Sequence, residues 1–222
     1  MSIDQDLKPI IGIDTAFASV SVCILNTLDF EPMAVRVLEL ERGHAEALVP
    51  LISEVIKLAG LRFRDLGRVA VSVGPGSFTG VRVGLSAARA IGLAAGLEVV
   101  GVSTLSAFAA PFFGRESPVI ASVIEARNGQ IYFQGYTTSG ATMIGPALGT
   151  VQEALLQIGP GPFWLAGTAA LRVEREAAEL DVSATCICQA FAPDVLDVAR
   201  LGAVSSSLVF PPRPSYVTKN SY

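Results

Sequence analysis

Two kinds of hydrophobic pattern fill the first half of the chain. Short apolar runs bounded by turn residues predict strands, and apolar residues that recur every three or four positions predict helices. Their order is three strands, a helix, a strand, a helix and a strand. The predicted strands cover residues 9–15, 20–25, 34–40, 68–73 and 98–102, and the predicted helices cover residues 45–59 and 80–95.

The second half begins the same order and then becomes irregular. Adjacent strands are predicted at residues 119–125 and 130–137, and glycine and proline accumulate after residue 139. We therefore expect an α/β protein with two ribonuclease-H-like domains, the architecture of the Hsp70, actin and sugar-kinase (ASKHA) superfamily. The domains are expected at residues 1–105 and 106–222. Further helices are predicted at residues 151–157 and 193–204, and a strand at 163–166.

Composition and charge narrow the function classes. The 222 residues are 51% hydrophobic and 16% charged, which is enough apolar material for buried cores. The formal net charge is −4 and the basic residues are scattered, which argues against a chain that binds nucleic acid by itself. Two aspartates precede the first apolar run, and no apolar stretch approaches about 18 residues, so we expect a cytoplasmic protein without a membrane anchor. The three cysteines are expected to be free thiols.

A glycine-rich turn at residues 74–80 lies between a predicted strand and a predicted helix, where backbone amides could hold an anion. A Walker A loop needs lysine and then serine or threonine after its last glycine, but Val81 and Arg82 follow here. A dinucleotide fingerprint needs a glycine where Thr79 stands. The surroundings of Ser77 do not form the G-x-S-x-G turn of a hydrolase nucleophile. The turn therefore matches none of these three templates.

His44 is the only histidine in the sequence. A metal site built from two histidines is therefore excluded, and a serine-hydrolase triad would have to recruit this one residue. Its position just before a predicted helix favours a capping or packing role. We expect no catalytic residue, no metal ligand and no cofactor.

Asp14 and Thr15 end the first predicted strand, where nucleotide-binding members of this superfamily place an acidic residue and a phosphate turn. Here no glycine follows, and bulky Phe17 disfavours close approach of a phosphate. Glu125 and Arg127 occupy the matching turn of the second half, where an ion pair between them is at least as plausible as ligand contact. The four charged or polar positions indicate a degenerate nucleotide site.

The helix at residues 80–95 carries a stripe of small side chains. Glycine inside a helix is unfavourable by about 1 kcal/mol relative to alanine, so Gly84 and Gly92 suggest a packing reason. Two explanations remain open, a second helix from a partner protein or the chain's own sheet. Arg82, Ser86 and Arg89 fall together on the opposite side. The stripe consists of Gly80, Gly84, Ala87, Ala88, Ile91, Ala94 and Ala95.

Several of these motifs together resemble the TsaB family, formerly called YeaZ. They are Ile-Gly-Ile-Asp-Thr-Ala at residues 11–16, the long run Gly-Pro-Gly-Ser-Phe-Thr-Gly-Val-Arg-Val-Gly at 74–84, and Gly-Val-Ser-Thr-Leu at 101–105. Glu-Ala-Arg at residues 125–127 and Tyr132 also match. The segment at residues 214–217 looks like a variant of the family's Pro-x-Tyr-Leu-Arg segment, but Val-Thr replaces Leu-Arg, so no function is carried onto it.

The resemblance implies a function through partner proteins. It implies a non-catalytic paralogue that binds and activates the catalytic subunit TsaD, which threonylcarbamoylates the adenosine 3′ of the anticodon, position 37, in tRNAs reading ANN codons. It also implies the ATPase TsaE as a further partner, tRNA contact only through the complex, and a homodimer through the same surface. The family's interface helices map onto residues 45–58 and 80–95. The partner-binding residues implied are Gly80, Arg82, Gly84, Ala87, Ala88, Ile91, Ala95, Leu48 and Ile52.

On this reading Gly84→Leu or Ala88→Arg would abolish partner binding and leave the monomer folded. Two enzymatic alternatives remain, a peptidase of the glycoprotease type and a small-molecule kinase of the same superfamily. The single histidine and the missing nucleophile turn argue against the peptidase. The lack of a phosphate turn after Asp14 argues against the kinase.

Overall fold

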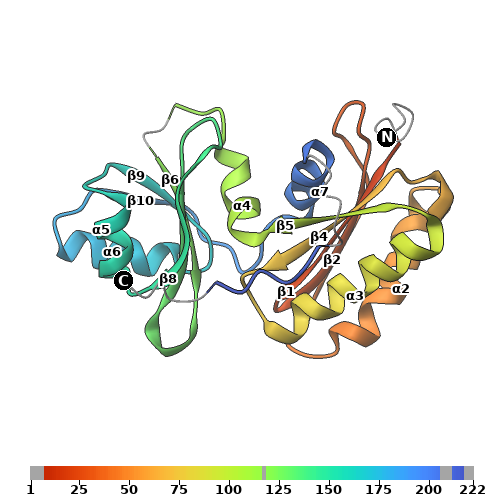
Figure 1. The fold of residues 1–222 in the computed structure, drawn as a ribbon, viewed down its shortest axis with the longest axis horizontal. Helices are drawn as coiled ribbons and strands as arrows, with labels where there is room; N and C mark the ends of the chain where they lie inside the picture. The colour runs from red at the N-terminus through yellow and green to blue at the C-terminus, as the bar shows by residue number, and fades with distance from the viewer. Residues whose placement is uncertain (1–7, 117–118, 206–211, 218–222) are drawn as a thin grey trace. The chain divides into compact units, whose positions relative to one another are not determined.

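The computed structural model describes residues 8–116, 119–205 and 212–217. Within these ranges the chain forms two compact units. Unit 1 contains the described parts of residues 1–104 and 193–215, and unit 2 contains those of residues 105–192 and from 216 onward. Each unit is built on one five-stranded mixed sheet (Figure 1).

The sheet of unit 1 has the order β3-β2-β1-β4-β5. The first three strands form an antiparallel meander, and β4 and β5 continue the sheet in parallel with β1. Strands β1, β2 and β4 are buried on both faces, which explains their near-continuous apolar sequences. The strands are β1 (Ile10–Phe17), β2 (Ser19–Leu25), β3 (Pro32–Glu39), β4 (Arg68–Gly74) and β5 (Glu98–Ser103).

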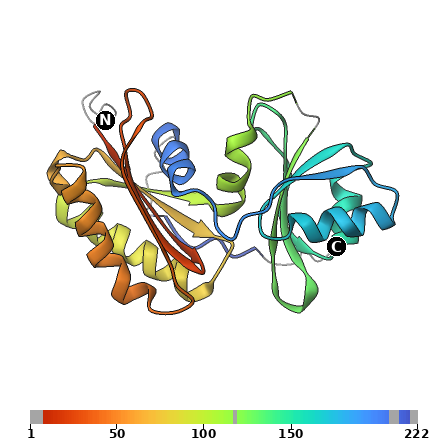
Figure 2. The same ribbon diagram turned by 180° about the vertical axis from the view of Figure 1, so that it is seen from behind.

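Helices cover both faces of this sheet. Helices α2 (His44–Leu58) and α3 (Phe78–Ala95) lie side by side on one face, where they enclose the main apolar core of the unit (Figures 1 and 2). Helix α7 (Val195–Val204) lies on the other face, against β1, β2 and β4.

Unit 2 repeats the strand order of unit 1, reading β8-β7-β6-β9-β10. Helices α5 (Val151–Ile158) and α6 (Ala170–Glu179) pack on one face and enclose a second core, whereas α4 (Thr104–Ala109) contributes to a small cluster on the other. The repeated order is the duplicated α/β architecture predicted from the sequence. The strands are β6 (Ile120–Glu125), β7 (Ile131–Tyr136), β8 (Thr142–Gly149), β9 (Phe163–Ala166) and β10 (Ala184–Cys188).

Helix α7 returns the chain to unit 1, whereas residues 106–222 were expected to form one domain. Gly12 allows this close contact, because a Cβ there would lie 3.0 Å from both Val195 O and Ala199 Cβ. Gly202 does the same at the other end of α7, where a Cβ would lie 2.4 Å from Ala70 Cβ. The long-range packing of these small residues assigns the segment to unit 1, and local pattern does not reveal it.

Arg68 on β4 fixes the carboxyl end of α7. Its Nη1 donates hydrogen bonds to the carbonyl oxygens of Gly202 at 3.0 Å, Ala203 at 3.0 Å and Ser205 at 3.2 Å. Its Nη2 lies 2.9 Å from Glu98 Oε2 on β5. A guanidinium at a helix C-terminus satisfies carbonyls that have no partner within the helix. No helix in the described ranges is long and apolar enough to span a bilayer.

Candidate functional site

The glycine-rich turn packs directly against the end of β1. A Cβ on Gly80 would lie 2.0 Å from Thr15 O, and one on Gly76 would lie 2.5 Å from Ala16 O. The Ser77 N–H donates to Ala16 O at 2.7 Å, and Thr15 Oγ1 donates to Gly80 O at 2.7 Å. The glycines therefore serve contact between two segments of the chain, since side chains at these positions would overlap the β1 backbone.

The same turn begins helix α3. Ser77 is the N-cap, and its Oγ accepts a hydrogen bond from the Gly80 N–H at 3.2 Å. Thr104 Oγ1 donates to Pro75 O at 2.5 Å and holds the other side of the turn. These contacts are those of a structural junction between β1, β4 and α3.

Most of the small-residue stripe of α3 lies against the sheet of its own unit, whereas Ala94 is exposed. Gly80, Gly84 and Ala88 are buried, and a Cβ on Gly84 would lie 2.4 Å from Thr15 Oγ1. Leu48 and Ile52 of α2 are buried in the same core. These five positions, expected to contact a partner, instead fill the interior of unit 1, so that assignment is corrected. The half-buried positions are Ala87, Ile91 and Ala95, and Arg82 is exposed.

The opposite side of α3 is exposed and mixes apolar with basic side chains; we call it the α3 outer face. Leu93 is 89% exposed and Phe78 is 59% exposed. The Arg82 guanidinium lies 3.3 Å from the centroid of the Phe78 ring, a cation–π contact. Arg89 donates a hydrogen bond to Pro212 O. The α3 outer face consists of Phe78, Arg82, Ser86, Arg89 and Leu93.

Asp14 is fully buried on the face of the sheet opposite the main core. Its Oδ1 accepts a long hydrogen bond of 3.4 Å from the Ala16 N–H, and its Oδ2 has no geometric hydrogen-bond partner in the described part of the chain. Ser21 and Ser72 on the neighbouring strands also have buried hydroxyls without such partners there. Burial raises the pKa of Asp14 to about 6, and the Ser72 hydroxyl, the Ala16 amide and His44 lower it by smaller amounts.

This burial predicts a pH-dependent stability. With a pKa of about 6 in the folded protein and 3.8 ordinarily, the folded state holds the Asp14 proton more tightly. Stability is therefore lost as pH rises through this window, and the loss reaches roughly 3 kcal/mol above pH 6. Asp14→Asn should be more stable than the natural protein by roughly 1–3 kcal/mol at pH 7.5 and nearly equal at pH 4. Urea unfolding at both pH values measures the difference.

The control for the comparison of Asp14→Asn with the natural protein is Glu41→Gln, because Glu41 is exposed and lies outside the strands. It should shift stability by less than about 0.5 kcal/mol at either pH. Parallel stability curves for Asp14→Asn and the natural protein from pH 4 to pH 7.5 would contradict the expectation.

Two further residues singled out in the sequence, Glu125 and His44, have structural partners. Glu125 pairs with Arg172 of α6, with oxygens 2.9 Å from Nε and 2.8 Å from Nη2, so the expected pairing with Arg127 is corrected. Sequence reasoning missed Arg172 because it assigned no helix there. His44 Nε2 donates to Phe17 O at 2.7 Å, a packing contact that joins α2 to the end of β1.

Comparisons with known proteins agree with this architecture. A family model described as "TsaD: tRNA N6-adenosine threonylcarbamoyltransferase" matches residues 38–220. An uncharacterized protein of Mycobacterium tuberculosis is 34% identical over 156 residues, 70% of each chain. The tRNA threonylcarbamoyladenosine biosynthesis protein TsaB of Escherichia coli is 33% identical over 132 residues, 57% of this chain and 54% of that protein.

A solved structure shares the fold. YeaZ from Pseudomonas aeruginosa superimposes with a TM-score of 0.69 at 20% identity, covering 87% of this chain and 90% of that one. A ROK family protein from Streptococcus pneumoniae, solved in complex with sucrose, has a TM-score of 0.50 at 13% identity, and the match covers 86% of this chain and 97% of that one. The duplicated ribonuclease-H-like architecture is thus the ASKHA fold.

Proposed function

The chain belongs to the TsaB (YeaZ) family, and from this premise we propose that it is a non-catalytic subunit that binds and activates TsaD. The reaction supported is threonylcarbamoylation of the adenosine 3′ of the anticodon, position 37, in tRNAs reading ANN codons. The names of the E. coli relative and of the matching family model support a role in threonylcarbamoyladenosine biosynthesis.

The observation that carries the proposed interface is the α3 outer face. Leu93 is 89% exposed in the last turn of α3, and Phe78 is 59% exposed at the start of the same helix. Exposed apolar side chains beside arginines have the composition of a protein interface.

The proposal that the chain is non-catalytic rests on the candidate catalytic residues, which are buried or bonded to other parts of the chain. Asp14 is fully buried within strand β1, and the His44 side chain is hydrogen-bonded to a backbone carbonyl. The glycine-rich turn is occupied by contacts to β1. No contact in the described ranges favours the peptidase or kinase alternative. ATP hydrolysis by the purified chain with micromolar affinity would overturn this part.

The proposal extends to a larger complex, in which this chain binds TsaD through the α3 outer face. TsaE joins the pair of subunits, tRNA is contacted only through the complex, and the complex works in the cytoplasm. In the absence of TsaD, a homodimer would use the α3 outer face as well, so the two assemblies would compete.

Leu93→Asp and Arg82→Glu test the interface. Each should weaken binding to TsaD at least tenfold, because a charge is placed in or reversed within the apolar and basic patch. Unfolding stability should change by less than about 1 kcal/mol, since both side chains are exposed. Binding is measured by mass in solution and by titration of TsaD, with tRNA modification as a second readout.

Leu171→Asp is the matched control, because Leu171 is a 46% exposed leucine on a helix of unit 2. It should bind TsaD as the natural protein does. Full affinity and full support of tRNA modification by both α3 variants would refute this assignment of the interface.

A further inference from the structure

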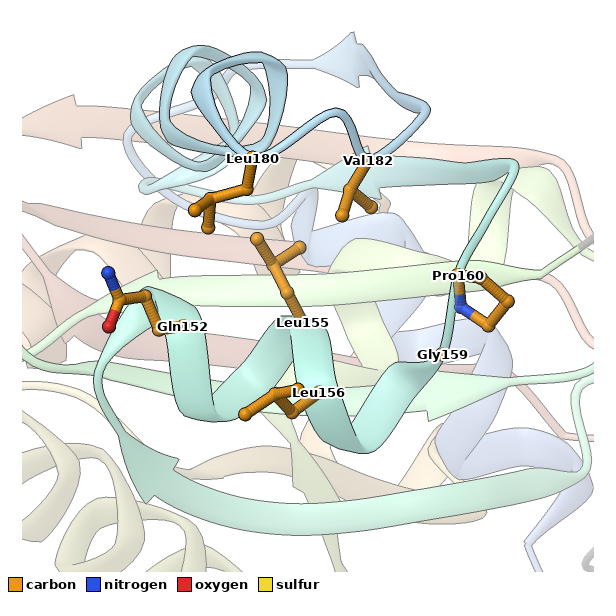
Figure 3. Close-up of a pocket in the computed structure, with 7 residues that line it drawn as sticks. All are labelled: Gln152, Leu155, Leu156, Gly159, Pro160, Leu180 and Val182. Atoms are coloured by element: carbon orange, nitrogen blue, oxygen red, sulfur yellow. The ribbon is translucent and has the colours of Figure 1, made fainter.

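Unit 2 carries an apolar groove between α5 and the segment that follows α6. The groove has a volume of about 610 Å³, in the range of ligand and peptide-anchor pockets. Figure 3 shows the Leu155 side chain pointing from α5 toward Leu180 and Val182, with Pro160 at one end and Gln152 at the other. The lining residues are Gln152, Leu155, Leu156, Gly159, Pro160, Leu180 and Val182.

Two leucines of the groove are unusually accessible. Leu156 is 84% exposed and Leu180 is 46% exposed, although the core of unit 2 lies directly beneath them and contains Leu155. Covering such side chains is favourable in proportion to the apolar surface that is removed from water. The groove is thus suited to receive apolar side chains.

The surroundings of the groove are negatively charged. Exposed Glu179 and Asp181 flank Leu180 in the sequence. Gly159 is the C-cap of α5 and Leu180 is the C-cap of α6, and helix carboxyl ends carry partial negative charge. None of the seven lining residues is basic.

The arginine side chains of α6 make contacts with groups outside the acidic flank of the groove. Arg172 pairs with Glu125 and with Glu176, the latter at 3.0 Å. Arg175 Nε donates to Leu171 O, one turn toward the amino end of the helix. The acidic flank at the end of α6 is therefore not neutralised by these arginines.

We propose that this α5–α6 groove binds an amphipathic protein segment whose apolar side chains are flanked by lysine or arginine. The apolar floor accounts for the anchors, and Glu179, Asp181 and the two helix ends account for the preference for cations. The proposal is independent of TsaD binding, because it involves unit 2 and none of the α3 outer face.

Two synthetic peptides of 14 residues test it with the full-length chain. Both carry the same leucines at helical spacing; one has lysine and the other glutamate at the remaining positions. Titrations followed by NMR should show the lysine peptide binding at least tenfold more tightly, with shifts centred on the groove residues. Raising the salt concentration should weaken that binding.

Variants locate the site. Leu156→Ser and Leu180→Ser should each weaken the lysine peptide at least fivefold, whereas Leu171→Ser, an exposed leucine of α6 outside the lining set, should not. Glu179→Lys combined with Asp181→Asn should remove the preference for lysine. Asparagine is chosen because Asp181 has a φ of 56°, which asparagine tolerates.

Four results would overturn the proposal. The first is equal affinity for both peptides, and the second is peptide binding that survives both leucine variants. The third is binding of an apolar dye when neither peptide binds. The fourth is a doubling of mass in solution that Leu180→Ser removes. The third result would indicate a small apolar ligand, and the fourth a second copy of the chain.

Discussion

Gly84→Leu is expected to prevent unit 1 from folding or to lower its unfolding free energy by more than about 3 kcal/mol. Even a Cβ at this position would lie 2.4 Å from Thr15 Oγ1, and that hydroxyl is bonded to Gly80 O at 2.7 Å. A leucine would have to displace α3 from the sheet, and overpacking of this kind is strongly destabilising. Circular dichroism and urea unfolding of the purified chain measure the effect.

Two further variants separate packing from helix propensity. Gly84→Ala should also destabilise the protein, although alanine favours a helix by about 1 kcal/mol over glycine elsewhere. Ser86→Leu, on the α3 outer face, should leave stability within about 1 kcal/mol. A folded, stable Gly84→Leu protein that had lost only partner binding would support the interface first inferred from the sequence instead.

Arg68→Met should lower the unfolding free energy by about 3–5 kcal/mol. It removes the donor to three carbonyl oxygens at the end of α7 and leaves Glu98 without its 2.9 Å partner. Removing one partner of a buried ion pair usually has an effect of this size. Urea unfolding gives the total effect, and hydrogen exchange should show α7 amides losing protection before those of β1.

Arg64→Met is the matched control, because Arg64 is exposed in the turn before β4. It should change stability by less than about 0.5 kcal/mol. Adding Glu98→Gln to Arg68→Met should recover part of the loss by removing the unpaired charge. A loss below about 1 kcal/mol in Arg68→Met alone would show that packing of α7, and not Arg68, holds the helix.

The spacing of apolar residues predicted most of the fold, because strands and helices each have a characteristic hydrophobic period. All five strands of unit 1 and both helices over its main core were predicted, and they form as expected. Strand β8 was missed because Gly145 and Pro146 indicate a turn, yet β8 is an edge strand, where proline is tolerated. Helices α4 and α6 and strand β10 were also missed. Helix α6 buries only Ala170, Val173 and Ala177, whose small side chains give a weak hydrophobic pattern.

The candidate site was harder to predict, because a helical pattern shows which residues share a side and not what covers them. Gly84 and Ala88 were grouped correctly on one side, but Ala94 of the same stripe is exposed, and the chain's own sheet covers the buried members. Arg172 was invisible as the partner of Glu125, since 47 residues separate them. Helical spacing puts Leu93 on the same side as Ser86 and Arg89, but only the structure shows that its side chain is 89% exposed.

The return of α7 to unit 1 has a consequence for synthesis on the ribosome. Unit 2 is encoded almost entirely within residues 105–192, so its core is complete before α7 has been translated. Unit 1 begins first but must wait, with the surface around Gly12 and Ala70 uncovered, until residues 195–204 emerge. The residues of unit 2 are thus synthesised as one continuous stretch before the helix that completes the sheet of unit 1.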